Sequence, residues 1–159
     1  MKKFVLLLIF IISMTSASAV EYRSVGSNAE FCAYTFDSEY FLFLSFKDDD
    51  DNRLSNNTIV KFKLLDGTVI RLEGTDGSTK TTTSAVNWGF GIVTGSSSEK
   101  HFAVVRITRE EIEMLAIGVD KVAINTLPEV YKRSKWSGKE TFGKRLYDDF
   151  MNLTSEFEE

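Results

Sequence analysis

The sequence predicts an α+β fold: a mostly antiparallel β-sheet or sandwich of about seven strands, one short capped helix and a C-terminal amphipathic helix. Two observations predict it. Up to residue 107, short apolar or alternating runs are separated by turn residues, which is typical of strands. Beyond residue 107, apolar residues recur every three or four positions, which is typical of helices. A single cysteine excludes an internal disulfide, so an apolar core, rich in the 13 phenylalanines, must stabilise the fold.

The strand pattern has one central member and one well-marked hairpin. The run 40–46 is apolar on both faces except at Ser45, which predicts a central strand covered on both sides. Asp66-Gly67 predicts a two-residue hairpin turn between strands 58–65 and 68–72. The Gly, Thr and Ser content predicts a loop or weak edge over 74–84 and a turn over 95–98. The remaining expected strands are 31–36, 85–94, 101–107 and 119–126.

Both expected helices have local signals. Thr108 and Glu111 have the spacing of a capping box, and Gly118 is placed to end that helix in the left-handed conformation. The second helix is expected over 139–157. Its apolar residues lie on one stripe that must pack on the sheet: Phe142, Leu146, Phe150, Leu153 and Phe157.

The first 19 residues have the pattern of a cleavable secretory signal peptide. Two lysines precede the apolar run 4–12, and Ala17-Ser18-Ala19 is a small-x-small cleavage site. The apolar run is about half the ~20 residues of a membrane span, so no span is expected after cleavage. We therefore expect residues 20–159 to form one globular domain exported to the periplasm or the extracellular space.

The charge and the motifs exclude several classes of function. The formal net charge is −4, which gives no electrostatic reason to bind nucleic acid. Asp48, Asp50 and Asn52 are spaced as in a calcium loop, but Arg53 and Ile59 stand where Gly and Glu are needed. No metal site and no cofactor are therefore predicted.

Other reactive side chains have structural interpretations. Cys32 lies in an apolar strand and is expected to be a buried, inert thiol. His101, the only histidine, is expected at the surface at the start of a strand. Five carboxylates on helix faces are expected to be solvated, although a glycosidase-like pair is not excluded: Glu110, Glu111, Glu113, Asp148 and Asp149.

One segment reverses the sign of the local charge. Residues 132–145 hold six basic residues and one acid, with Tyr131 and Trp136 within or beside them. We expect Pro128 to end the preceding strand and 131–138 to be a surface connector. Tyr131, Arg133 and Trp136 are the candidate binding residues, because a guanidinium suits an anion and an indole ring suits a sugar. Alternatively, Trp136 packs as an anchor beside the terminal helix while the lysines remain solvated.

Three segments resemble small uncharacterised exported proteins of Bacteroides-type bacteria: Lys63 to Ile70, Ile107 to Leu115, and Gly118 to Ile124. The three segments cover about 15% of the chain. The resemblance implies an extracytoplasmic setting and no known activity.

Three functions are compatible with these features. The first is an exported, non-catalytic binding or accessory domain, whose partner would be an anionic small molecule, a glycan or an envelope protein. The second is a small extracytoplasmic hydrolase with a carboxylate pair that distant residues assemble. The third is an adaptor or subunit of a cell-envelope assembly that uses an exposed sheet edge or the terminal helix.

The Ala17-Ser18-Ala19 site predicts that the mature chain begins at Val20, because signal peptidase accepts only small side chains before the cut. Intact mass spectrometry of the exported protein checks this. A product that still carries residues 4–12 would contradict it.

Overall fold

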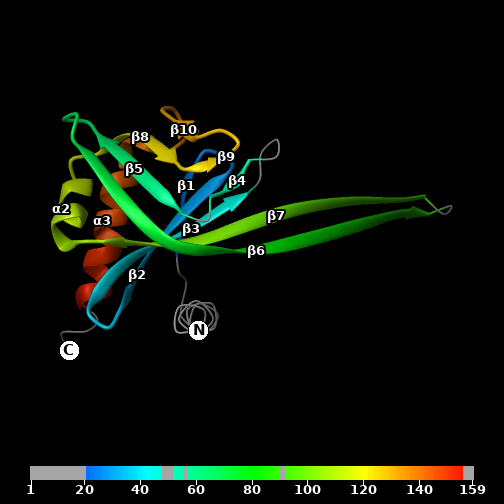
Figure 1. Cartoon of the computed structure of the whole chain (residues 1–159), viewed down its shortest axis with the longest axis horizontal. Coiled ribbons are helices and arrows are strands. Elements are labelled where there is room, and N and C mark those ends of the chain that lie inside the picture. The colour runs from blue at the N-terminus through cyan, green and yellow to red at the C-terminus, as the bar shows by residue number, and fades with distance from the viewer. Residues whose placement is uncertain (1–20, 48–51, 56, 90–91, 156–159) are drawn as a thin grey trace.

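Eight strands form one antiparallel sheet in the order β1-β2-β3-β7-β6-β5-β8-β10, and β4 pairs with β9 (Figure 1). The structure is a computed structural model that describes residues 21–47, 52–55, 57–89 and 92–155. The elements are β1 (Arg23–Val25), β2 (Ala29–Phe36), β3 (Glu39–Lys47), β4 (Arg53–Leu54), β5 (Ile59–Leu64), β6 (Val69–Gly89), β7 (Ile92–Ile107), α2 (Arg109–Leu115), β8 (Val119–Ile124), β9 (Thr126–Leu127), β10 (Tyr131–Arg133) and α3 (Lys139–Ser155). The predicted α+β class is confirmed.

The core lies on the inner side of a curled sheet. Phe31 of β2 meets Phe62 of β5 with ring centroids 5.4 Å apart, although three strands separate β2 from β5 in the sheet order. Phe142 of α3 packs against both rings, at 6.0 Å and 6.1 Å. Helix α3 therefore closes the curl with its predicted stripe, of which Phe142, Leu146 and Phe150 are buried. Phe157 lies outside the described residues.

The local signals around both helices and the central strand are confirmed. The Thr108 hydroxyl accepts a hydrogen bond from the Glu111 amide at 3.3 Å, and the Glu111 carboxylate accepts one from the Thr108 amide at 2.9 Å. Gly118 ends the segment at φ +106°. Strand β3 lies between β2 and β7, and residues 42–46 are buried on both of its faces.

The hairpin between β5 and β6 has a three-residue turn, so the predicted two-residue turn is wrong. Lys63 pairs with Val69, and the Leu64 amide donates to the Thr68 carbonyl at 2.8 Å. The Gly67 amide donates to the Leu64 carbonyl at 3.0 Å, and Gly67 has φ +90°. A type I turn followed by a left-handed residue gives this geometry. The positive φ that the sequence predicted at Gly67 is confirmed.

Strands β6 and β7 alter three further predictions. Residues 74–84, expected as a loop or weak edge, lie in β6 and pair with β7, so the loop is wrong. The turn expected over 95–98 is wrong, because these residues lie in β7. The expected strand 85–94 is divided between the end of β6 and the start of β7. The cause is pairing: Thr82 lies opposite Ser98 and Thr83 opposite Ser97, and β-branched threonine suits a paired strand.

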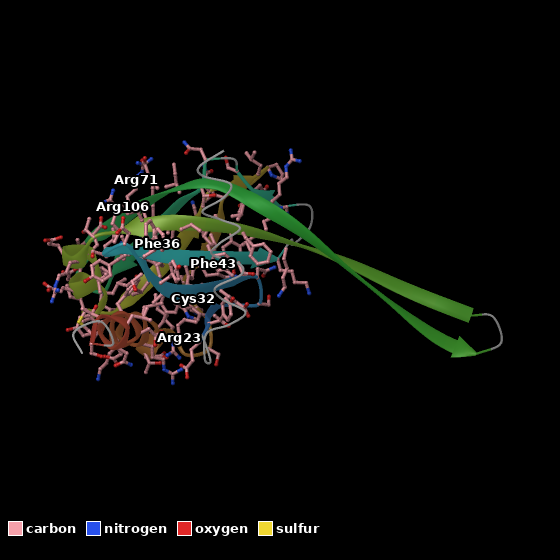
Figure 2. The ribbon with its side chains drawn as sticks, turned by 90° about the horizontal axis from the view of Figure 1, so that it is seen from below. Arg23, Cys32, Phe36, Phe43, Arg71 and Arg106 are labelled. Carbon is pink, nitrogen blue, oxygen red and sulfur yellow. The ribbon has the colours of Figure 1, made fainter. Side chains whose placement is uncertain are left out.

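The paired ends of β6 and β7 form an arm that leaves the body of the molecule (Figures 1 and 2). The last residues of β6 and the first of β7 are paired from Thr79 opposite His101 to Gly89 opposite Ile92. Beyond the Lys80–Lys100 pair, the eight residue steps from 81 to 89 correspond to about 26 Å at the usual rise. We call residues 81–89 and 92–99 the arm.

The described part of the chain contains helices in which a membrane span can be sought, but it does not contain the predicted signal peptide. Residues 1–20, including the predicted signal peptide, lie outside the described residues. In the described ranges, no helix combines the length and apolar character needed to cross a membrane.

The conformation of Gly67 generates a stability prediction. A Cβ at this position would meet no atom within 4 Å, so the cost of a substitution is conformational rather than steric contact with neighbours. We expect Gly67→Val to lower the free energy of unfolding by about 1 kcal/mol or more. Gly67→Asn is the control, because asparagine tolerates the left-handed region and should cost less. Urea denaturation measures both, and equal losses would contradict the turn geometry.

Candidate functional site

Tyr131 is a core residue rather than part of a surface connector. It begins β10, pairs with Ile124 of β8 and is 6% exposed. Its ring packs edge-on against Phe46, with centroids 5.2 Å apart, and its hydroxyl donates to the Val25 carbonyl at 3.0 Å. The prediction that 131–138 lie at the surface is therefore wrong at Tyr131, because β10 continues the sheet beyond β8.

Arg133 is held against Tyr131. Its Nε donates to the Tyr131 hydroxyl at 3.0 Å, and its guanidinium carbon lies 5.2 Å from the centre of that ring. Gly26 lies beside both groups at φ +66°, and a Cβ there would be 3.0 Å from the Tyr131 hydroxyl. Tyr131 and Arg133 thus connect the last strand of the sheet to the first, and we call them the edge clasp.

Trp136 makes a separate set of contacts. Its half-buried ring packs perpendicular to Phe142 at 5.7 Å, and the Lys139 ammonium lies 5.8 Å from its centre. The Lys139 ammonium also donates to Asp120 at 2.9 Å and to the Ser134 carbonyl at 2.7 Å. This arrangement matches the alternative in which Trp136 anchors the start of α3.

The basic residues of 132–145 are dispersed over the molecule. Lys132 is exposed on β10, while Lys144 and Arg145 are exposed on α3. Arg133 belongs to the edge clasp and Lys139 to the Trp136 contacts. The charge reversal in the sequence is thus divided among several surfaces of the molecule.

The cysteine prediction is confirmed and the histidine prediction is wrong. Cys32 is 1% exposed, and burial raises the pKa of its thiol to about 12, which disfavours the reactive thiolate. His101 is also buried, because it alternates along β7 with Ala103, Val105 and Ile107, whose side chains belong to the main core.

Cys32 belongs to a second apolar cluster on the outer face of the sheet, opposite the main core (Figure 2). Its centre is Phe43, which stacks on Phe102 with ring centroids 5.5 Å apart. Tyr34 and Val104 pack around these residues. The cluster fixes the position of the thiol.

Several candidate carboxylates have structural partners. Asp149 accepts two hydrogen bonds from Arg23, at 2.8 Å and 2.7 Å. Glu111 caps α2, and Glu113 lies 3.6 Å from Arg109. Asp66 and Asp120, which are not among the five candidates, have lowered pKa values because they accept hydrogen bonds from the Thr68 amide and from Lys139, respectively. The partners of Glu111, Glu113 and Asp149 indicate that these carboxylates stabilise the fold rather than act as catalytic acids.

Metal binding has no support in the described part of the chain, where no group of three or more His, Cys, Asp or Glu side chains could hold an ion. Most of the acidic run, 48–51, lies outside that part. The amide oxygen of Asn52 accepts a hydrogen bond from the Glu129 amide at 3.3 Å.

The arm is the feature that sequence reasoning missed. Strand β7 pairs with β3 only as far as Lys100, opposite Lys47. Strand β6 pairs with β5 only as far as Glu73, opposite Ile59. A signal was available, since residues 81–98 contain no charged side chain while 26% of the chain is charged. Threonine-rich and serine-rich runs on the two sides of 89–91 are suited to pairing with one another.

No family model matches this chain, and no similar curated protein or solved structure was found in the comparisons. The resemblance to exported proteins of Bacteroides-type bacteria stays a prediction, as does export itself.

The edge clasp generates the prediction for this site. Tyr131→Phe keeps the ring against Phe46 but leaves the Val25 carbonyl and Arg133 without the hydroxyl. We expect a loss of about 1–3 kcal/mol in the free energy of unfolding. Tyr40→Phe is the matched control, because among the described residues the Tyr40 hydroxyl has no hydrogen bond while its ring packs on Phe150. Urea denaturation of both variants checks this, and equal midpoints would show that the hydroxyl does not hold the two edges.

Proposed function

We propose that this protein is a non-catalytic binding subunit of an extracytoplasmic assembly, and that the arm is its contact element. The observation that carries the proposal is the pairing of the arm. Its two strands pair with each other, whereas β7 pairs with β3 only as far as Lys100 and β6 pairs with β5 only as far as Glu73. This combines the binding-domain and adaptor hypotheses, and makes the exposed sheet edge the functional part.

The physical reason is that an isolated two-stranded ribbon is marginally stable in water. The outer edges of such a ribbon present backbone N–H and C=O groups that another strand can pair with. Proteins usually protect such edges with charged side chains or proline. Residues 81–98 contain neither.

The absence of charge also lowers the cost of covering the arm. A partner that buries an uncharged strand leaves no unpaired ion in the interface. The sequence places Val86, Trp88, Ile92 and Val93 near the end of the arm, and such residues favour burial. The arm is therefore suited to insertion against a protein partner.

The body of the molecule is paired independently of the arm. The start of β6 pairs with β5 over Val69 to Glu73, and the end of β7 pairs with β3 over Lys100 to Ile107. The main core includes residues from these body segments, Ile70, Leu72, Ala103, Val105 and Ile107. The arm can therefore be removed in an experiment without removing those core residues.

The hydrolase hypothesis has less support. Glu111 and Asp149, two of its candidate carboxylates, are engaged by the α2 cap and by Arg23, which leaves them poorly placed to act as an acid and a base.

The test removes the arm and maps its contacts in the native host. In the shortened variant, Asn-Gly replaces residues 81–99 and closes the Lys80–Lys100 pair as a tight hairpin. We expect a melting temperature within about 4 °C of the full chain, because the core is kept. A photo-crosslinking amino acid at position 82 of the full chain is expected to give one discrete adduct with another protein, and mass spectrometry identifies the partner.

The control places the same crosslinker at position 65, in the β5–β6 turn, where Leu65 is 67% exposed. We expect no discrete adduct from this position. Adducts of the same protein from both positions, or none from position 82, would overturn the proposal.

A further inference from the structure

The outer face of four neighbouring strands carries a cluster of positive charge. Strands β6, β5, β8 and β10 lie side by side in the sheet (Figure 1). All five cations on this face are exposed, and we call them the cationic face: Lys61, Lys63, Arg71, Lys121 and Lys132.

The register of the strands places these cations beside one another. Lys61 of β5 lies directly opposite Arg71 of β6, and Lys63 lies directly opposite Lys121 of β8. Directly opposed residues have Cβ atoms about 5 Å apart, and like charges there repel. The sheet thus holds two like-charge pairs in adjacent rows.

A small residue continues the first row. Ala123 of β8 lies opposite both Lys61 and Lys132 of β10. The row from Arg71 through Lys61 and Ala123 to Lys132 spans three strand spacings, or about 14 Å. The face is therefore an extended strip of cations rather than a point site.

Acidic side chains compensate this charge only in part. Arg71 forms an ion pair with Glu73. Asp120 lies near Lys63 and Lys121, but its carboxylate is bound by Lys139 at 2.9 Å. Among the described residues, the four lysines of the face have no carboxylate within ion-pair distance.

The cationic face contrasts with the chain as a whole, whose formal net charge is −4. The Debye length is about 8 Å at physiological ionic strength, so salt screens the more distant negative charges of the chain. A ligand bound at the face therefore responds mainly to the nearby cations. The Lys63–Lys121 pair has no carboxylate within ion-pair distance, and in the Lys61–Arg71 pair only Arg71 has one. The remaining repulsion destabilises the sheet unless an anion bridges the cations.

We propose that the cationic face binds an acidic polysaccharide, whose repeated carboxylate or sulfate groups contact successive cations along the strip. This inference is independent of the arm and goes beyond the proposed function. A single small anion could contact only part of a strip of this length. A chain with repeated charges contacts several cations at once, which raises its affinity.

The composition of the face favours a polysaccharide over a nucleic acid. Four of its five cations are lysines. A lysine acts as a point charge and lacks the planar guanidinium group with which arginine donates two parallel hydrogen bonds to one guanine. Apart from one another, the cations of the strip lie opposite Val69 and Ala123, and neither side chain can stack on a base.

The test measures binding of a heparin decasaccharide to the purified chain by calorimetry at low and physiological salt. We expect binding that weakens as salt rises, and no binding of neutral dextran. Lys61→Gln with Lys63→Gln should weaken binding roughly tenfold or more, since both central cations are lost. The melting temperature of this variant should be equal or higher, because it removes two repulsive pairs.

The matched control is Lys47→Gln with Lys144→Gln, which makes the same change in net charge at exposed lysines away from the face. We expect its affinity to remain within about twofold of the unsubstituted chain. Equal weakening in the two variants, or no binding of heparin, would overturn the proposal. Tighter binding of a single-stranded DNA of equal charge would overturn the choice of a polysaccharide.

Discussion

The fold depends on a contact between the two ends of its sheet. The Tyr131 hydroxyl of the last strand donates to the Val25 carbonyl of the first, and Arg133 donates to the same hydroxyl. Gly26 allows this approach, since a Cβ there would be 3.0 Å from the hydroxyl oxygen. The contact keeps the sheet curled, and the curl brings Phe31 and Phe62 together under α3. A flat sheet with the same pairing would leave these rings apart.

The curl also separates the two faces of the sheet by chemistry. The inner face and the apolar stripe of α3 bury one continuous cluster of side chains. On the outer face, alternation along β5 directs Lys61 and Lys63 away from that cluster, while Val60, Phe62 and Leu64 enter it. The outer face is therefore available for binding because the inner face and α3 already provide the core.

The sequence predicted features whose cause is local. The cap at Thr108, the left-handed Gly118 and the stripe of α3 depend on residues within a few positions of each other. The strands of the arm are close in sequence, and the signal for their pairing is the uncharged, Thr-rich and Ser-rich composition of residues 81–98. Tyr131 depends on contacts with the distant Val25 and Phe46, and no pattern around Tyr131 reports these partners. The same limit applies to the cationic face, whose lysines come from positions 61 to 132 and meet only through the register. Tyr131 and Arg133 contact each other, and they lie against Val25 and Gly26 at the other edge of the sheet.

The two proposed surfaces differ in the interaction that each can offer. Residues 81–98 have no charged side chain, so the arm can associate through backbone hydrogen bonds and apolar contacts that salt screens weakly. The cationic face offers an extended strip of point charges, so its binding must weaken as ionic strength rises. The body holds the cationic strip whether or not the arm is covered, because the cations lie on β5, β8, β10 and the first residues of β6. A subunit built in this way can be attached to an assembly by the arm while the cationic face stays in reversible contact with an anionic polymer.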